Sequence, residues 1–549
     1  MKYYLFHLLI SALAVISTVS CSDDDNITGV IKGPVKEVTL SGQVTCNGSP
    51  VEGVTVSDGV EVVRTDSDGK YSLVSQKKYG YVFISVPGGY MCETEGSKPL
   101  FWQKIKGTAP TEEHSFRLTE EENTVHRLIV SADYHLADRY GSQDLHTFEQ
   151  TFMEDIRNLA SSDIRTYGIA LGDMTWDIYW DQYSMSDYGM QAKEFPMPTF
   201  NVIGNHDYDM SKTDDFKAEQ VYRSNLGPTF YSFNLGKCHY VVLDDIVYIN
   251  KGQSREHDTY VSQEQLDWLM KDLENIPHDT PVFICMHCAA FDISGVSDTG
   301  GIIKVGLNFS KATMERKLAD CLKDYTEVHI LTGDTHINQS IPPASMPSAY
   351  SNMYEHNIAA VCASWWWTTY MSGNSICKDG SEGGYMVFDN NATDIRWRYK
   401  SMRYDFSKQF RCYDFNTIRQ YLDTDIMVPV FFDKYSSRER YSSFSENTVF
   451  INVWNWDPDW TVKVTENGTE LPVTQHYIED PLHTISYDIP RTYTNGELTS
   501  SFRTIKTHHM FSVQASSADT SLEITVTDPF GNVSKEIMSR PKAFNADID

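Results

Sequence analysis

Five short apolar segments in the middle of the chain each stop at side chains that can bind metal ions. The segments are HRLIVSAD, YGIALGD, TFNVIGNHD, PVFICMHC and VHILTGDTH, and the polar residues that end them are Asp133, His135, Asp173, Asn205, His206, His287, Asp334 and His336. A single histidine or aspartate after a strand is more often structural. Because these segments read as strands, and because open α/β sheets collect ligands at the carboxyl ends of their strands, we expect the polar residues to meet.

The residue types indicate the chemistry. Carboxylates, an asparagine amide and imidazoles suit hard or borderline divalent metal ions better than thiolate-loving ones. Two such ions, roughly 3.5–4 Å apart, can share a bridging carboxylate and a hydroxide that acts as the nucleophile at neutral pH. Phosphate ester hydrolysis needs this combination, because the uncatalysed reaction is very slow and the charge on the phosphoryl oxygens must be neutralised. None of the segments offers the lysine and glycine-rich loop of a nucleotide cradle.

The motifs occur in the order D-x-H, G-D, G-N-H-D, an isolated H and G-D-x-H. From about residue 125 to 400 this order resembles the calcineurin-like metallophosphoesterases, whose last motif is G-H-x-H. The resemblance implies two divalent metal ions (manganese, iron, zinc or magnesium), with Asp133, His135 and His336 on the first, Asp173 bridging, and Asn205 and His287 on the second. It also implies that His206 stands beside the leaving group as an acid or charge stabiliser, and that Asp207 supports it.

Asp334 departs from the family pattern, which has a histidine ligand of the second metal ion at this position. A carboxylate can still bind the ion, and its charge would favour a harder metal such as manganese, iron or magnesium. Its shorter reach could instead leave the second site weak. Because Gly333 and His336 keep the rest of the turn, we expect Asp334 to be a ligand.

The run ASWWWTTY gives the main indication of how a substrate could be recognised. Adjacent residues of a strand point to opposite faces, so at least one of the three tryptophans belongs to the core. Trp365 and Trp367 share a face and could stack on a sugar, an inositol or a base. A purely structural role for the run is equally compatible with the sequence.

The N-terminus has the features of an exported protein. Residues 1–20 combine Lys2 with an apolar run that ends in small residues, as in a secretory signal peptide. Cys21 follows at the position of a lipoprotein acceptor, and CSDDDN resembles the acidic lipoprotein export signal of Bacteroidetes. The resemblance implies an outer membrane lipoprotein on the cell surface, or alternatively on the periplasmic face, held to the membrane only by its lipid. An ordinary signal peptide with a chance cysteine is the alternative.

The 549 residues are too many for one hydrophobic core. After the signal peptide (1–20) and a lipidated tether (21–35), residues 36–120 alternate apolar and polar residues between turns and resemble a carboxypeptidase-regulatory-like β-sandwich, in which Cys46 and Cys92 could form a disulfide. Residues 124–401 form the phosphoesterase-like catalytic domain, and 402–549 a second β-sandwich. The fold class is thus α/β: a four-layer α/β/β/α sandwich, implied by the resemblance, flanked by two all-β sandwich domains.

The net charge and the lengths of the apolar runs limit the classes of partner that we expect. A net charge of −29 disfavours nucleic acid, and no second apolar run reaches the ~20 residues of a membrane span. We therefore expect a metal-dependent hydrolase of phosphate mono- or diesters that acts on a phosphorylated small molecule, lipid or glycan. The alternative is a non-catalytic surface lipoprotein that binds a glycan or a partner through a degenerate metal site.

Overall fold

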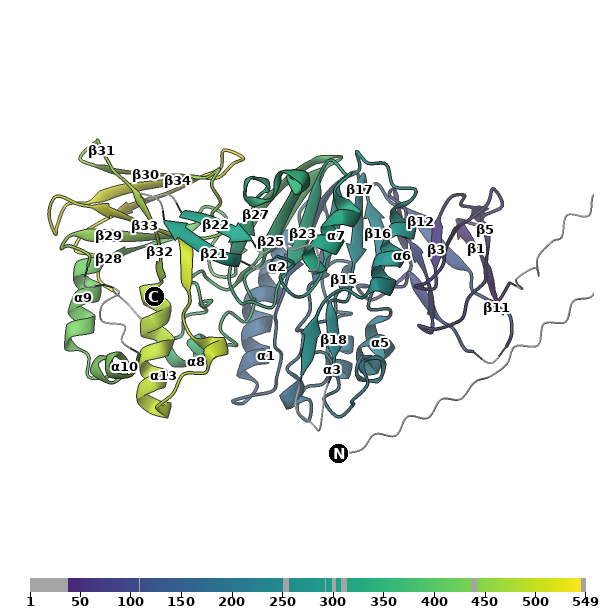
Figure 1. The fold of residues 1–549 in the computed structure, drawn as a ribbon, viewed down its shortest axis with the longest axis horizontal. Helices are drawn as coiled ribbons and strands as arrows, with labels where there is room; N and C mark the ends of the chain where they lie inside the picture. Colours follow the sequence, from purple (N-terminus) through teal and green to yellow (C-terminus); the bar gives the residue numbers. More distant parts are fainter. Residues whose placement is uncertain are drawn as a thin grey trace, which may run out of the picture. The chain divides into compact units, whose positions relative to one another are not determined.

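A computed structural model describes residues 38–107, 109–249, 256–291, 293–298, 303–307, 314–435, 441 and 443–544 (Figure 1). The predicted signal peptide, the tether and Cys21 lie outside the described residues. Among the helices that the structure describes, none has the length and apolar character needed to cross a membrane.

The first central sheet carries three parallel strands, β13 (Val125–Ser131), β14 (Arg165–Ala170) and β15 (Thr199–Asn201). On the other side of β13, β26 (Gly384–Asn391) pairs antiparallel and is followed by β27 (Asp394–Ser401), which gives the order β15-β14-β13-β26-β27. The strands are rich in branched apolar residues because a sheet covered on both faces buries both sets of side chains.

The second central sheet has the order β16-β17-β20-β23-β25-β24. Its strands are β16 (Tyr231–Leu235), β17 (Cys238–Val242), β20 (Val282–Cys285), β23 (Val328–Thr332), β24 (Gln339–Ile341) and β25 (Met353–Asn357). The four strands β17, β20, β23 and β25 run parallel, whereas β16 and β24 are antiparallel edge strands. This sheet is therefore mixed, and the carboxyl ends of its parallel strands meet on one side.

Aromatic rings join the two sheets face to face. The ring of Phe388 on β26 lies 5.7 Å from that of Phe283 on β20, centroid to centroid, and Phe200 on β15 stacks on Phe233 of β16 at 3.6 Å. The flanking helices are α1 (Gln143–Phe148), η1 (Glu149–Met153), α2 (Glu154–Ala160), α3 (Met185–Gln191), α4 (Asp215–Ala218), α5 (Gln220–Leu226), α6 (Gln263–Leu273) and α7 (Met314–Leu322). The predicted four-layer α/β/β/α sandwich is confirmed.

The N-terminal β region forms two larger sheets, ordered β11-β1-β12-β7, with β2 and β5 also on β1, and β10-β6-β3-β4, and the two-stranded sheet β8-β9. Its strands are β1 (Leu40–Cys46), β2 (Ser49–Pro50), β3 (Thr55–Ser57), β4 (Val62–Arg64), β5 (Lys70–Leu73), β6 (Tyr81–Ser85), β7 (Tyr90–Cys92), β8 (Thr94–Glu95), β9 (Lys98–Pro99), β10 (Trp102–Lys104), β11 (Glu112–Glu113) and β12 (Phe116–Glu120). The expected disulfide is wrong, because Cys46 and Cys92 are free and both lie opposite Leu118 on the intervening β12. Two strand spacings, roughly 10 Å, exceed the reach of a disulfide.

The C-terminal region also forms two sheets, ordered β28-β29-β33-β32 and β31-β30-β34-β35. Its strands are β28 (Phe410–Asp414), β29 (Thr448–Val453), β30 (Thr461–Glu466), β31 (Thr469–Leu471), β32 (Thr474–Glu479), β33 (Lys506–Gln514), β34 (Leu522–Thr527) and β35 (Val533–Met538). Helical segments that the sequence did not predict accompany them: α9 (Phe415–Thr424), α10 (Val428–Tyr435), α12 (Pro481–His483), η5 (Thr484–Asp488), α13 (Ile489–Asn495) and η6 (Ser500–Phe502).

Short elements fill the connections. These are η2 (Asp177–Tyr179), α8 (Trp367–Ser372), the 3-10 turns η3 (Pro343–Ser345) and η4 (Ser348–Tyr350), and the hairpins of β18 (Ile246–Tyr248) with β19 (His257–Thr259) and of β21 (Ile293–Asp298) with β22 (Ile303–Leu307). The 401/402 domain boundary stays a prediction.

Candidate metal centre

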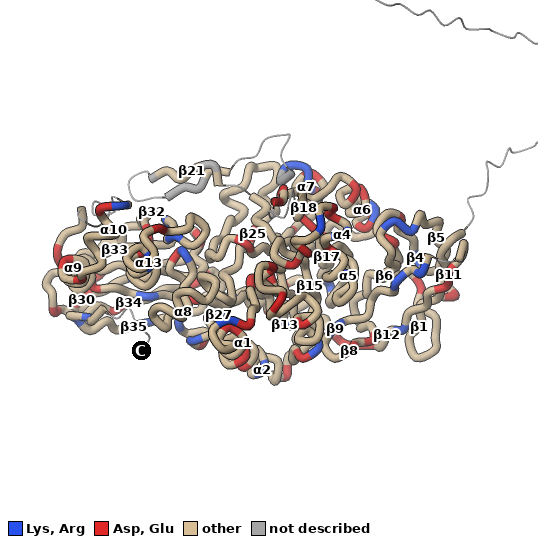
Figure 2. The backbone as a smooth tube through the Cα atoms, turned by 90° about the horizontal axis from the view of Figure 1, so that it is seen from below, with Lys and Arg blue, Asp and Glu red and all other residues tan. Residues whose placement is uncertain are grey.

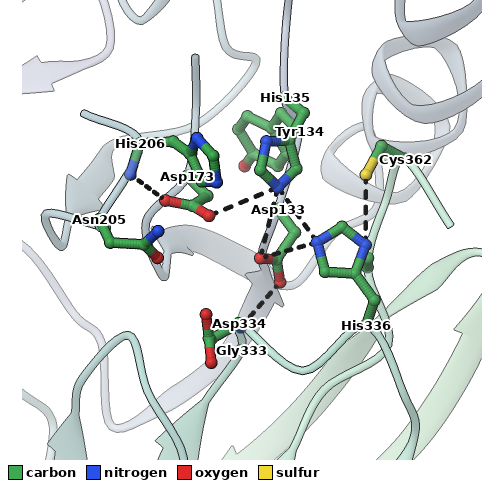
Figure 3. A network of polar contacts seen from close by, with 12 residues as sticks. Asp133, Tyr134, His135, Asp173, Asn205, His206, Gly333, Asp334, His336 and Cys362 are labelled. Atoms are coloured by element: carbon green, nitrogen blue, oxygen red, sulfur yellow. Dashed lines mark hydrogen bonds and ion pairs between the residues drawn. The ribbon is translucent and has the colours of Figure 1, made fainter. Parts of the chain in front are cut away.

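The loops that leave β13, β14, β15, β20 and β23 bring the predicted ligands into one cluster (Figure 3). On one side, His336 Nε2 lies 3.1 Å from His135 Nε2 and 3.4 Å from Asp133 Oδ1. On the other side, His287 Nε2 lies 3.1 Å from Asn205 Oδ1 and 3.7 Å from Asp334 Oδ1. The carboxyl ends of the strands therefore bring together side chains that are up to about two hundred residues apart in the sequence.

Asp173 belongs to both sides of this cluster. Its Oδ2 lies 3.4 Å from His135 Nε2 and 3.3 Å from His287 Nε2. Its other oxygen, Oδ1, accepts a hydrogen bond from the backbone N–H of His206 at 2.7 Å. Asp173 is thus held by one oxygen and presents the other between the two sets of ligands.

The backbone at the cluster is unusual. Residues with left-handed φ that are not glycine include Asp133 (56°), His135 (43°), Asp173 (53°), Asp334 (64°) and His336 (54°). Such residues are uncommon, and their strain persists only where the surroundings fix it, typically at functional sites. The sharp turns after the strands thus direct several donor side chains to one point at an energetic cost.

The donor set fits metal ions. The Nδ1–H of His336 donates to the carbonyl of Ala363 at 2.5 Å, so its Nε2 carries the lone pair that faces Asp133. Burial lowers the pKa of His336 and of His135 well below the usual value, which keeps both imidazoles neutral. Asp133 Oδ1 is buried and has no hydrogen-bond partner among the described residues. Electron pairs that converge in this way repel one another unless a cation lies between them.

The carboxylates of the cluster also favour a bound cation. Burial lowers the pKa of His287, but the carboxylates of Asp173, Asp133 and Asp334 outweigh it and raise that pKa well above its usual value. The cluster therefore attracts positive charge at His287, and a metal ion that binds there has to displace a proton. Groups of three donors whose ligand atoms lie within 4.8 Å of one another include Asp133–Asp173–His287, His135–Asp173–His206 and His287–Cys288–Asp334.

Comparisons with known proteins place the chain. A sequence model described as the N terminal of calcineurin-like phosphoesterase matches residues 38–121, and one described as the C terminal of calcineurin-like phosphoesterase matches residues 355–533. The two matches support the calcineurin-like metallophosphoesterase family for this chain. They support a hydrolase of phosphoric esters, and the family implies divalent metal ions. The C-terminal match begins within β25, upstream of the predicted boundary at residue 402.

Comparisons with curated sequences and with solved structures give less information about this chain. No curated protein sequence matches the chain. Among solved structures, a Staphylococcus aureus protein described as a candidate 5′-nucleotidase, in complex with α-ketoglutarate, is similar at 12% identity and a TM-score of 0.29. The match covers 50% of this chain and 53% of that one, about half the length of each. At this score it carries no argument about the phosphoesterase.

His206 is held beside the cluster by a residue that the sequence reasoning missed. His206 Nδ1 lies 2.8 Å from Asp177 Oδ1, and its ring lies 4.8 Å from that of His135, centroid to centroid. Asp177 is the second aspartate of LGDMTWD and begins the short helix η2. A carboxylate four residues after a predicted ligand was a signal, but its partner across the loop could not be read from sequence.

Asp207 supports the loops and not the cluster itself. Its carboxylate accepts hydrogen bonds from the backbone N–H groups of Gly204 (3.0 Å) and Thr175 (3.1 Å), which joins the loops after β14 and β15. Burial raises the pKa of Asp207 to about 7. Asp245, also missed, plays the same part at β20, because its carboxylate accepts from the N–H groups of His287 (3.2 Å) and Cys288 (2.8 Å).

The tryptophan run does not form a strand. Ala363, Trp365 and Trp366 have left-handed φ values of 52°, 51° and 64°, and α8 begins at Trp367. Trp366 is fully buried and donates to the Tyr134 carbonyl at 3.1 Å, which confirms that at least one tryptophan is core. The shared face expected for Trp365 and Trp367 is wrong, because the chain turns between them.

Trp365 nevertheless borders the cluster, and Trp367 packs against the apolar group that contains Trp365. Trp365 stacks on His336, with ring centroids 3.5 Å apart and an angle of 10° between the rings. Trp367 lies 5.1 Å from the guanidinium of Arg139, which donates to the Trp365 carbonyl at 3.0 Å. Arg139 is buried and also donates to Asp144 at 2.6 Å. These contacts fix the aromatic wall next to His336.

Proposed function

We propose that this phosphoesterase hydrolyses phosphate mono- or diesters at a dinuclear metal site. The observation that supports two ions is the place of Asp173 Oδ2, 3.4 Å from His135 on one side and 3.3 Å from His287 on the other. A carboxylate between two donor sets is what a shared ligand requires.

The proposed ligands divide at Asp173. Asp133, His135 and His336 would hold one ion, Asn205, His287 and Asp334 the other, and Asp173 both. Oxygen and imidazole donors suit manganese, iron, zinc or magnesium. When bound, the ions would supply a bridging hydroxide as nucleophile and would neutralise the oxygens of the phosphoryl group.

The chain's own residues position the remaining groups. Asp177 accepts from Nδ1–H of His206 and so fixes the orientation of this imidazole. With Nε2 also protonated, His206 can give a proton to the departing alcohol oxygen or stabilise its charge. Asp207 and Asp245 hold the loops from which His206 and His287 project, so their effect on the reaction is through position.

The first experiment measures metal ions per chain by elemental mass spectrometry and the hydrolysis of 4-nitrophenyl phosphate and bis(4-nitrophenyl) phosphate. We expect about two ions per chain and turnover of at least one ester. Asp173→Asn removes the ligand that the two ions would share, so both the metal content and the activity should fall. Asp181→Asn, at an exposed position, should change neither quantity. A wild-type protein with one ion or none after incubation with manganese, iron or zinc contradicts the dinuclear proposal and favours a non-catalytic binding role.

The family indicates a phosphorylated small molecule as substrate. We propose that phosphorylated lipids or glycans are included and nucleic acids are not, because the net charge of −29 repels a polyanion. Lysines and arginines are interspersed with acidic residues along the described chain (Figure 2). Hydrolysis of sugar phosphates, unaffected by an excess of oligonucleotide, would agree with this proposal; competition by the oligonucleotide would contradict it.

We also propose an outer membrane location through a lipid on Cys21, on the strength of the N-terminal sequence alone. Radiolabelled palmitate should enter the wild-type protein and not Cys21→Ser. Protease added to intact cells should degrade the protein if it faces outward. Absence of label from the wild type would refute the lipid attachment.

A further inference from the structure

Lys378 is a cation beside the candidate metal centre that has no anionic partner within hydrogen-bond or ion-pair distance among the described residues. Its backbone N–H donates to the carbonyl of His336 at 3.2 Å, and its carbonyl accepts from the N–H of Ile505 at 3.1 Å. Its Nζ lies 5.5 Å from the ring centroid of Trp365. Within the part of the chain that the structure describes, this ammonium makes no hydrogen bond and no ion pair.

Lys378 lies near the accessible side of the cluster. The side chain of Asp334 is 39% exposed, whereas those of Asp133, His135, His287 and His336 are fully buried. Lys378 contacts this part of the cluster through His336, which lies two residues after Asp334 and accepts the backbone N–H of Lys378.

Lys378 lies between residues of the C-terminal region and residues of the loop after β23. Trp365, whose ring stacks on His336, also meets the ring of Phe502 edge-on at 4.5 Å. Ile505 and Phe502 come from the C-terminal region, and His336 from the loop after β23. The backbone of Lys378 and the ring of Trp365 beside it are therefore held by the C-terminal region as well as by the loop after β23.

Lys378 is half-buried. A half-buried cation without an anionic partner gains from a ligand that supplies the anion. A phosphoryl group bound at the metal centre carries such a charge. We propose that the Lys378 ammonium binds a non-bridging oxygen of the phosphoryl group in the substrate and in the phosphate product. This inference rests on the proposed function, since it assumes that phosphoryl groups bind at this cluster.

Inorganic phosphate is the probe that separates the two proposals, because its binding to the metal-loaded protein is measured by calorimetry without turnover. Lys378→Met should weaken phosphate binding by about 10- to 100-fold, the usual effect of losing a hydrogen bond to a charged group. Lys378→Arg keeps the charge and should restore most of the affinity. Lys535→Met removes an exposed lysine paired with Glu523 and should leave the affinity unchanged.

Metal content is measured in the same samples. Unchanged phosphate affinity in Lys378→Met would overturn the inference. Loss of metal ions from that variant would also overturn it, because Lys378 would then serve only to support the ligands. If Lys378→Met does not fold, Lys378→Gln takes its place in the comparison. A wild-type protein that binds phosphate but hydrolyses no ester would refute the proposed function and leave the role of Lys378 supported.

Discussion

Replacing Asp334 tests the ligand at which this chain departs from its family. Asp334→Asn removes the charge and keeps the shape, and asparagine tolerates the left-handed φ of 64° at this position. The backbone N–H of Asp334 donates to Asp133 Oδ2 at 3.1 Å, a bond that does not depend on the side chain. The turn should therefore survive the substitution, and any change in metal binding should come from the lost charge.

The expected loss of metal affinity follows from the position of the Asp334 carboxylate. Asp334 Oδ1 lies 3.7 Å from His287 Nε2, so an ion shared by these two side chains would lie close to both. A pair of unit charges about 4 Å apart attracts by about 4 kcal/mol at an effective dielectric constant of 20. Because the side chain is 39% exposed, solvent screens much of this attraction. We take about 1.5–3 kcal/mol, a loss of about 10- to 100-fold in affinity for the second ion.

The assay is equilibrium dialysis against a manganese series, with metal ions per chain determined by elemental mass spectrometry. Asp334→Asn should retain one ion at concentrations where the wild type holds two, and its turnover should fall in parallel. Asp334→His, which restores the family's residue, should shift the preference of the second site toward zinc. Asp181→Asn is the control. If Asp334→Asn and Asp334→Ala both keep two ions at wild-type affinity and full turnover, the reasoning is refuted.

Three further predictions concern protons. His206→Ala should lower kcat by about 10²- to 10⁴-fold with metal content unchanged, and Asp177→Asn should lower it less; a near-normal rate in His206→Ala would remove its role as acid. Metal affinity should fall as the pH falls, because the carboxylates raise the pKa of His287 and the ion must displace its proton; a pH-independent dissociation constant between pH 5 and 8 would contradict this. Burial raises the pKa of Glu219 to about 7 although Arg223 opposes it. The folded state then binds this proton more tightly than the unfolded state, so stability is fully present below about pH 4.5 and is lost as the pH rises to about 7. Tm measured across this window should fall in the wild type more than in Glu219→Gln; equal slopes would exclude Glu219 as the cause.

The metal cluster could be predicted because each ligand follows from a local pattern. An apolar run that stops at a polar residue gives the end of a strand, and the parallel order of β13 and β14 then brings Asp133 and Asp173 together. Neither step depends on how side chains pack. The tryptophan run failed for the opposite reason, since the turn at Trp365 is set by its stacking on His336 and not by the propensities of its own residues.

Lys378, Phe502 and Asp177 could not be placed from sequence. Lys378 lies next to His336 through a single backbone hydrogen bond, and Phe502 reaches Trp365 from the region expected to form a separate sandwich. Such proximities arise when loops from distant parts of the chain pack together, and they leave no periodic signal. The sequence did not predict the helices of the C-terminal region because each helix is short and presents only a few apolar residues to the sandwich.

The pairing of β13 with β26 has a consequence for how the protein is made. The strand that leads to Asp133 and His135 has its second neighbour in Gly384–Asn391, with Leu128 opposite Phe388. Until the ribosome has passed that point, one edge of the ligand-bearing strand exposes its peptide groups to other chains. A truncation at residue 354 would keep every proposed ligand in its sequence and still leave this edge open. Completion of the active centre is therefore a late event in the synthesis of the chain, and a cell that produces the protein has to protect that edge until then.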